Sequence, residues 1–213
     1  MKNTTFIFIR HAESEKNLKD ITGGKGEELT KKGIEQTNDL IKNILTKITT
    51  EDCSIISSNI IQAQQTAALI ANSLNLPCEI TTQLKPADMG IINGLTKHEI
   101  KTKYPKQYEQ LARWRKQEIE ACELNVPHME SPQLFWDRIL SYIKTICNGG
   151  VKIVICTRSV LVLVYNYVHN KNPKPGGGYK HIGIDNCELI AFVADNTGRV
   201  HKLINSITSK NLQ

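Results

Sequence analysis

Residues 4–17 of the chain read TTFIFIRHAESEKN. The first six, Thr4–Ile9, are mostly β-branched or aromatic, which predicts a short buried strand. Arg10 and His11 follow at the point where this strand ends. Ligands of parallel α/β sheets bind beyond the carboxyl ends of the strands. We therefore expect Arg10 and His11 at a binding site, provided that the strand belongs to such a sheet.

Outward from this strand, predicted strands and helices alternate along the chain. Further strands are predicted at Cys53–Ser57, Cys78–Thr82 and Val151–Cys156, and a hairpin at Cys187–Ala194 and Arg199–Ile204. Helices are predicted after Thr30, from Ile60 to Leu74, after Ser131-Pro132 and at Ser159–Val168. In the first of these helices, one face is expected to hold Ile34, Ile41, Ile44, Leu45 and Ile48. The alternation predicts an α/β fold with a mostly parallel sheet that helices cover on both faces.

Residues from about 84 to 126 break this alternation. They contain Gly90, Gly94 and Pro105, followed by a charged segment with Trp114. We interpret the region as an inserted loop-and-helix cap over one end of the sheet. The chain has 213 residues, so we expect a single domain, 1–213, with this cap as its insertion. A turn-rich loop is predicted at Asn172–Gly178.

Composition excludes several classes of protein. With 40% hydrophobic and 23% charged residues, most of the chain is expected to fold. No apolar run is long enough to cross a bilayer, and the run Phe6–Ile9 is too short for a secretory signal. We therefore expect a cytoplasmic protein. Six scattered cysteines without a CxxC spacing predict reduced thiols and argue against a zinc site.

The net charge of +6 favours anionic partners. The basic residues are spread along the chain and form no block, so neither a nucleic-acid nor a membrane partner is predicted. A lysine-rich, solvated surface explains the same charge. The oligomeric state is left open.

Arg10 and His11 offer a defined chemistry. A histidine held at a strand end can present a ring nitrogen as a nucleophile. The guanidinium of the adjacent arginine is a planar fork of donors suited to phosphate oxygens. Taken alone, however, the dipeptide is better explained as a surface arginine beside a hydrogen-bonded structural histidine. The wider pattern of motifs changes this balance.

Five motifs occur in order along the chain. They are IFIRHAESEKN, ELTKKGIEQ, SSNIIQAQQTA, LKPADMGIINGLT and VPHMES. Together they resemble the histidine phosphatase superfamily, the group that includes phosphoglycerate mutases, over about residues 4–205. The resemblance implies a three-layer α/β/α sandwich, a transient phosphohistidine on His11, and no metal or other cofactor.

The first motif of that family is R-H-G-E-x-x-x-N. Arg10, His11, Glu13 and Asn17 match it, and Ala12 stands where glycine is usual. The resemblance thus implies that His11 is the catalytic nucleophile. It also implies that Arg10 and Asn17 bind the phosphorylated substrate.

Two departures from the family fall at substrate-binding positions. Gln62 stands in place of a phosphate-binding arginine, so hydrogen bonding is kept and a charge is lost. Asn59 and Gln62 also fit a capping box at a helix start. Arg158 either replaces the family's second histidine or follows a deleted one. A guanidinium can clamp an anion but cannot move a proton, so we assign Gln62 and Arg158 to substrate binding.

The family's acidic residue after the third strand is also missing, because Lys85 and Pro86 occupy that segment. Asp88 lies just beyond it, and Glu130 matches the family's P-x-G-E-S loop. These two carboxylates are our candidates for the catalytic acid. For each of them, a solvated loop carboxylate is an equally good interpretation.

These residues leave two main interpretations open. The first is a phosphomonoester hydrolase that acts through a phosphohistidine on His11, with Glu130 or Asp88 as the acid. The second is a degenerate relative that binds an anionic ligand or a protein partner without hydrolysis. A third interpretation is a different reaction on an anionic substrate. Arg158 allows it, but no residue specifies which reaction that would be. A hydrolase is preferred to a mutase, because the cap region offers no obvious clamp for a second phosphate.

Overall fold

The computed structural model describes residues 2–48, 51–169, 171 and 173–204. Residue 172 of the predicted turn-rich loop and residues 205–213 of the predicted domain lie outside this part. A six-stranded sheet has the order β4-β3-β6-β1-β7-β8. Its strands are β1 (Thr4–Arg10), β3 (Cys53–Ser58), β4 (Cys78–Thr81), β6 (Gly150–Cys156), β7 (Leu189–Ala194) and β8 (Val200–Ile204).

The sheet is mostly parallel. The pairs β1–β6, β3–β6 and β3–β4 are parallel, whereas β1–β7 and β7–β8 are antiparallel. The predicted strands and the C-terminal hairpin are therefore confirmed. Because β1, β3 and β6 run in the same direction, their carboxyl ends meet at one edge of the sheet.

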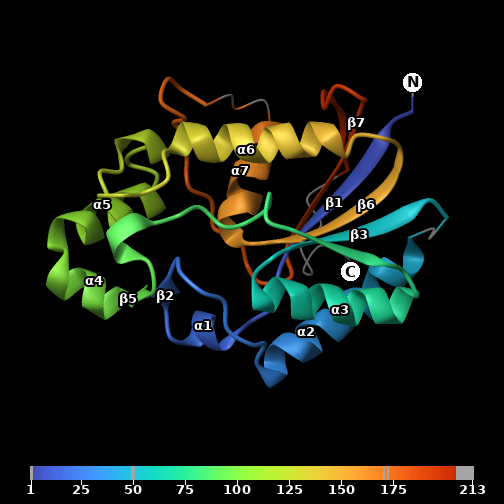
Figure 1. Cartoon of the computed structure of the whole chain (residues 1–213), viewed down its shortest axis with the longest axis horizontal. Coiled ribbons are helices and arrows are strands. Elements are labelled where there is room, and N and C mark those ends of the chain that lie inside the picture. Colours follow the sequence, from blue (N-terminus) through green and yellow to red (C-terminus); the bar gives the residue numbers. More distant parts are fainter. Residues whose placement is uncertain (1, 49–50, 170, 172, 205–213) are drawn as a thin grey trace.

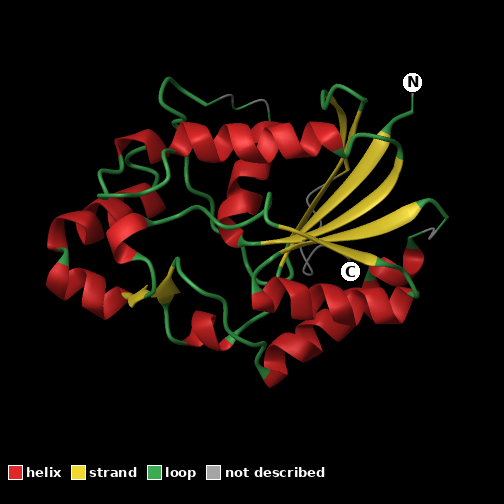
Figure 2. Cartoon of the chain, viewed as in Figure 1, coloured by secondary structure: helices red, strands yellow, loops and turns green. Residues whose placement is uncertain are grey.

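Helices cover both faces of this sheet, as Figures 1 and 2 show. The helices α2 (Lys31–Asn43) and α3 (Ile61–Leu74) lie on one face, and α6 (Pro132–Thr145) and α7 (Arg158–Val168) on the other. Strand β1 alternates between the two layers: Phe6 and Phe8 join the core with α6 and α7, and Ile7 and Ile9 join the core with α2 and α3. The predicted α/β/α sandwich is confirmed.

Two predicted helix starts are confirmed by their caps. The Thr30 side chain accepts a hydrogen bond from the Gly33 N–H, and Ser131 accepts one from Leu134. One predicted face is wrong in part, because Ile34 is 42% exposed while Ile41 is buried. The buried face of α2 consists of Gly33, Thr37, Leu40 and Ile41, and Ile34 lies at its margin. Ile44, Leu45 and Ile48 lie beyond the end of α2 at Asn43, where a 3₁₀ turn follows.

The predicted cap contains two helices and several short elements. They are η2 (Gly90–Ile92), β5 (Leu95–Thr96), α4 (Lys97–Lys103), α5 (Pro105–Arg115) and η3 (Ala121–Glu123). Strand β5 pairs with β2 (Ile21–Thr22), which follows the short helix α1 (Glu15–Leu18). The cap has a small core of its own, formed by Ile92, Ile100, Leu111 and Val126. Figure 1 places α4 and α5 beyond one end of the sheet. Across the described residues, no helix has the length and apolar character needed to cross a membrane.

Candidate active site

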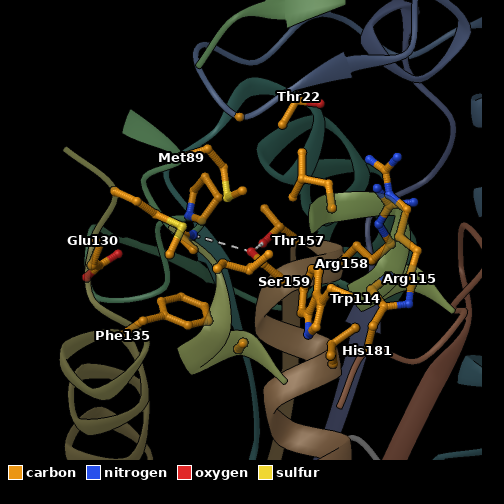
Figure 3. A pocket seen from close by; sticks show the side chains of 18 of the residues that line it. Thr22, Met89, Trp114, Arg115, Glu130, Phe135, Thr157, Arg158, Ser159 and His181 are labelled. Carbon is orange, nitrogen blue, oxygen red and sulfur yellow. Dashed lines mark hydrogen bonds between the residues drawn. The ribbon is translucent and has the colours of Figure 1, made fainter. Parts of the chain in front are cut away.

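A cavity of about 180 Å³ lies between the carboxyl ends of the central strands and the cap. Four of its lining residues come from the sheet side of the molecule and form what we call the basic floor: Arg10, His11, Gln62 and Arg158. The cap contributes Trp114 and Arg115 from the last turn of α5. Figure 3 shows Met89, Glu130 and Phe135 on the left of this cavity and Trp114, Arg115, Arg158 and His181 on the right.

His11 is fixed by its backbone and by its own ring. Its N–H donates to the Cys156 carbonyl, and its carbonyl accepts from the Asn186 side chain. The ring nitrogen Nδ1 lies 2.8 Å from the Ala12 carbonyl oxygen. A carbonyl can only accept, so Nδ1 carries the hydrogen and Nε2 keeps a free lone pair.

The electrostatic surroundings keep this ring uncharged. His11 is 4% exposed. Burial, followed by the positive charge of Arg10, lowers the pKa of His11 to about 3. At neutral pH the ring therefore has the protonation state that a nucleophile needs.

Arg10 is buried beside His11 and is only partly satisfied. Its Nη1 donates to the Ile184 carbonyl over 2.6 Å. Its Nε is buried and has no hydrogen-bond partner within the described part of the chain. Burial, followed by the charge of Arg158, lowers the pKa of Arg10 to about 10, so the side chain stays charged at neutral pH. A buried donor without a partner is a group that an anion could satisfy.

Arg158 is the first residue of α7, directly after the N-cap Thr157. Its side chain lines the cavity and keeps contact with solvent. Loss of solvent, followed by the charge of Arg115, lowers the pKa of Arg158. In the described ranges, no ion pair joins Arg158 or Arg115 to a carboxylate. Both guanidinium groups are therefore available to an anionic ligand.

Gln62 lines the cavity and is 2% exposed. Its Oε1 is buried without a hydrogen-bond partner among the described residues. The capping-box interpretation is wrong, because the N-cap of α3 is Ile60 and not Asn59, and no side chain caps it. The Thr66 hydroxyl accepts from the Ala12 N–H and donates to the Gln62 carbonyl, which ties α3 to the segment after β1.

The two candidate acids lie in different surroundings. Glu130 lines the cavity, and Arg138 holds both of its carboxylate oxygens, Nε to Oε1 at 3.1 Å and Nη2 to Oε2 at 2.9 Å. Asp88 is exposed and is not among the residues that line the cavity. Its Oδ1 accepts from the Gly90 N–H at 2.8 Å. Both carboxylates are thus already engaged by the protein, and their role as acids stays a prediction.

Asn17 lines the cavity near its rim. Its Oδ1 accepts from the Ser14 N–H and from the Asn186 side chain, so Oδ1 is used to hold the loop after His11. The amide hydrogens of Asn17 remain for a ligand. Its assignment to substrate binding stays a prediction.

The lining residues that were not predicted from the sequence include Lys16, Trp114, Arg115 and His181. Trp114 and Arg115 are the last two residues of the charged helix α5. An aromatic residue next to an arginine was the one sequence feature that could have indicated a ligand contact in the cap. The ring of His181 meets the Trp114 ring edge-on at 4.8 Å. Burial, followed by the charge of Arg158, lowers the pKa of His181 to about 4. The cavity thus holds a second uncharged imidazole at neutral pH, which comes from the loop after α7 and not from the position of Arg158.

Within the described residues, no group of three or more His, Cys, Asp or Glu side chains is arranged to hold a metal ion.

The sequence matches the family model described as histidine phosphatase superfamily (branch 1) over residues 6–207. The chain belongs to the histidine phosphatase superfamily. This membership confirms the resemblance drawn from the five motifs. Members of the superfamily are phosphomonoester hydrolases or mutases that bind small phosphorylated substrates.

Curated relatives share part of the histidine phosphatase sequence. The 2,3-bisphosphoglycerate-dependent phosphoglycerate mutase of Bradyrhizobium sp. (strain BTAi1) is 30% identical over 120 residues, which cover 54% of this chain and 56% of that protein. The chain thus spans about half the length of the curated relatives that it matches first. The 6-phosphofructo-2-kinase/fructose-2,6-bisphosphatase 3 of Bos taurus is 29% identical over 172 residues, which are 79% of this chain and 34% of that protein.

Solved histidine phosphatase structures match almost the whole chain. A phosphoglycerate mutase from Bacillus anthracis has a TM-score of 0.75 at 20% identity and covers 97% of this chain and 93% of its own. The Bacillus stearothermophilus protein YhfR has a TM-score of 0.80 at 18% identity and covers 96% and 98%. At these identities the likeness shows the fold alone.

Proposed function

We propose that this chain hydrolyses phosphomonoesters through a transient phosphohistidine on His11. The observation that carries the proposal is the neutral His11 ring in the cavity, with Nδ1 bound to the Ala12 carbonyl and Nε2 free, beside the incompletely satisfied Arg10. A nucleophile and a cation are thereby supplied by consecutive residues at one strand end.

In the first step, Nε2 of His11 attacks phosphorus, the N–P bond forms and the bond from phosphorus to the alcohol oxygen breaks. Arg10 and Arg158 stabilise the charge that spreads over the three phosphoryl oxygens. In the second step, water attacks phosphorus, inorganic phosphate leaves and Nε2 recovers its lone pair. Asn17 and Gln62 add uncharged hydrogen-bond donors to the same group.

The alcohol oxygen needs a proton as it leaves. Glu130 is the candidate acid that lines the cavity, and Asp88 is the second. Because Arg138 holds both oxygens of Glu130, we expect proton transfer to be slower than in an enzyme with a free carboxylic acid. Slow turnover, rather than none, is the expected behaviour.

The test is phosphate release from 4-nitrophenyl phosphate, combined with mass spectrometry of the enzyme quenched during turnover. We expect a phosphoryl group on His11 and a loss of at least about 1000-fold in His11→Ala. His98→Ala is the matched control, because His98 is exposed and lies outside the cavity. Turnover that survives in His11→Ala would refute the proposal.

The second candidate function, anion binding without hydrolysis, is favoured by the uncharged Gln62 at the family's arginine position and by the two engaged carboxylates. The double variant Gln62→Arg with Arg158→His restores both family residues. Calorimetry with inorganic phosphate measures binding separately from turnover. Phosphate binding without any turnover in the wild type, and turnover in the double variant, would establish this second function.

A further inference from the structure

Apart from the basic floor, the cavity is lined largely by apolar side chains. We call six of them the apolar chamber: Met89, Leu111, Trp114, Met129, Phe135 and Tyr179. They come from the segment before η2, from α5, from the loop before α6, from α6 itself and from the loop after α7. Segments far apart in the sequence have thus converged to build an apolar surface beside charged groups. Such a surface can take an apolar part of a ligand out of water while the charged groups beside it hold an anion.

Backbone pairing holds two of these residues in place. Met89 and Met129 are opposite each other in an antiparallel β-bridge, so their side chains project to the same side. Both are only partly buried and pack against the core of the cap. Methionine side chains are unbranched and polarizable, and they adapt to the shape of an apolar ligand.

Two polar groups that border the chamber already have partners. The indole N–H of Trp114 donates to the Tyr179 carbonyl at 3.3 Å, so the ring offers only apolar surface. The Ser159 hydroxyl bonds the Thr157 hydroxyl at 2.9 Å and accepts from the Ala87 N–H. Figure 3 shows these last bonds between the two sides of the cavity. The Trp114 indole N–H and the Ser159 hydroxyl are therefore not free to bind a hydroxyl group of the substrate alcohol.

The cavity is large enough for one aromatic ring. An apolar protein cavity of about 150 Å³ accommodates benzene. The cavity here measures about 180 Å³. An aromatic ring can therefore lie against the methionines and Phe135.

We infer that the preferred substrate is a phosphomonoester of an apolar, ring-sized alcohol, such as an aryl phosphate. The inference rests on the proposed function for the position of the phosphoryl group and adds the chemistry of the alcohol. In this arrangement the basic floor holds the phosphoryl group. The apolar chamber takes the alcohol out of water.

The test uses binding of non-hydrolysable phosphonates, so it does not depend on turnover. Calorimetry at pH 8 compares phenylphosphonate and methylphosphonate on the wild-type protein, and compares the hydrolysable ester 3-phosphoglycerate with phenylphosphonate on His11→Asn. Burial of a phenyl ring in place of a methyl group is expected to tighten binding by about 10- to 50-fold. 3-Phosphoglycerate should bind more weakly than phenylphosphonate.

Two variants locate the effect. Met129→Gln keeps the size of the side chain and adds polarity, so it should reduce the preference for phenylphosphonate by about fivefold or more and leave methylphosphonate unchanged. Leu134→Gln is the matched control, because Leu134 is 64% exposed on α6 and does not line the cavity. It should change neither constant.

Equal binding of the phenyl and methyl compounds, or tighter binding of 3-phosphoglycerate, would overturn the inference and leave the proposed hydrolysis standing. Failure of all three anions to bind would overturn both. Hydrolysis absent in a protein that still prefers phenylphosphonate would refute the proposed function alone.

Discussion

The basic floor and the cap differ in what holds them. Arg10 and His11 lie at the end of β1, and Gln62 and Arg158 lie in the first turns of α3 and α7, next to the cores on the two faces of the sheet. Most of the cap, residues 84–126, packs around a separate small core of four buried residues, whereas Leu84 and Ala121 join the core with α6 and α7. The cap supplies Met89, Leu111 and Trp114, which are half of the apolar chamber. Under the proposed function, the groups that act on the phosphoryl group and half of the surface that selects the alcohol thus come from separate parts of the molecule.

Substitution of one arginine in each region tests this separation most strongly. Arg10→Lys loses the fork of donors at the floor, and we expect kcat to fall by about 100- to 1000-fold. Arg115→Lys changes an exposed cap residue that makes no ion pair with the described residues, and we expect KM to rise by less than about tenfold with little change in kcat. The measurement is steady-state hydrolysis of an aryl phosphate. Equal losses of kcat in the two variants would contradict the division between floor and cap.

The second prediction concerns the stability of the floor towards acid. Burial holds the pKa of His11 at about 3, compared with 6.5 as the ordinary value. Between these values the unfolded chain binds the proton and the folded chain does not. Acidification through this range therefore favours unfolding, by about 1.4 kcal/mol per pH unit from this group.

Urea denaturation at pH 6, 5 and 4 measures this slope. In His11→Asn, the dependence of the unfolding free energy on pH should be shallower than in the wild type by about that amount. Above pH 6.5 the contribution of His11 is fully present, so the two slopes should coincide there. A variant whose slope between pH 6 and 4 equals that of the wild type would show that the His11 ring is not held neutral by the fold.

The floor was predictable from the sequence because it depends on where strands end. The apolar run Thr4–Ile9 and the run before Thr157 are short and bounded, so Arg10, His11 and Arg158 could be placed at one edge of the sheet. In the structure these three residues line one cavity. The periodicity did not predict the exposure of Ile34, because Ile34 lies at the margin of the face of α2 that Gly33, Thr37 and Leu40 bury.

The lining of the cavity from the cap could not be predicted in the same way. Arg115 and Trp114 reach the cavity because of how α5 packs, and only one residue of that helix, Leu111, is buried. The sequence of α5 is polar on most sides, so its pattern does not predict which face packs inward. His181 lies in an irregular loop after α7, where no periodic pattern exists. The engagement of Glu130 by Arg138 spans eight positions and depends on the turn into α6.

Two glycines in the cap, Gly90 and Gly94, test how tightly the cap packs against the loop before α6. Gly90 has φ +56° and lies so close to the loop before α6 that an added Cβ would be 2.1 Å from the Pro127 carbonyl oxygen. Gly94 has φ +77° and nothing within 4 Å of the same position. Gly94→Ala should cost about 1–2 kcal/mol of unfolding free energy from backbone strain alone. Gly90→Ala should cost about 1–3 kcal/mol more, from crowding.

Thermal and urea unfolding of both variants give this difference directly, with each acting as the control for the other. Because Gly90 contacts the segment that carries Met129, Gly90→Ala should also weaken phenylphosphonate binding, whereas Gly94→Ala should not. Equal stability of the two variants would mean that the loop before α6 yields to the added methyl group.

The smallest expected effect comes from the helix caps of the two regions. The Thr96 hydroxyl accepts from the Glu99 N–H at the start of α4 in the cap, and the Thr30 hydroxyl accepts from the Gly33 N–H at the start of α2 beside the sheet. Each Thr→Ala change should cost about 1 kcal/mol of unfolding free energy.

Hydrogen exchange distinguishes the two variants. Thr96→Ala should speed the exchange of amides in α4 and α5 and leave the exchange of amides in β1 and β6 unchanged, because most of the cap packs around its own core. Thr30→Ala should instead lower the protection of the sheet amides together with those of α2, since α2 shares a core with β1 and β6. If Thr96→Ala lowered the protection of β1 and β6 to the same extent, the cap and the sheet would open as one unit, and the floor could not be regarded as independent of the region that shapes the substrate pocket.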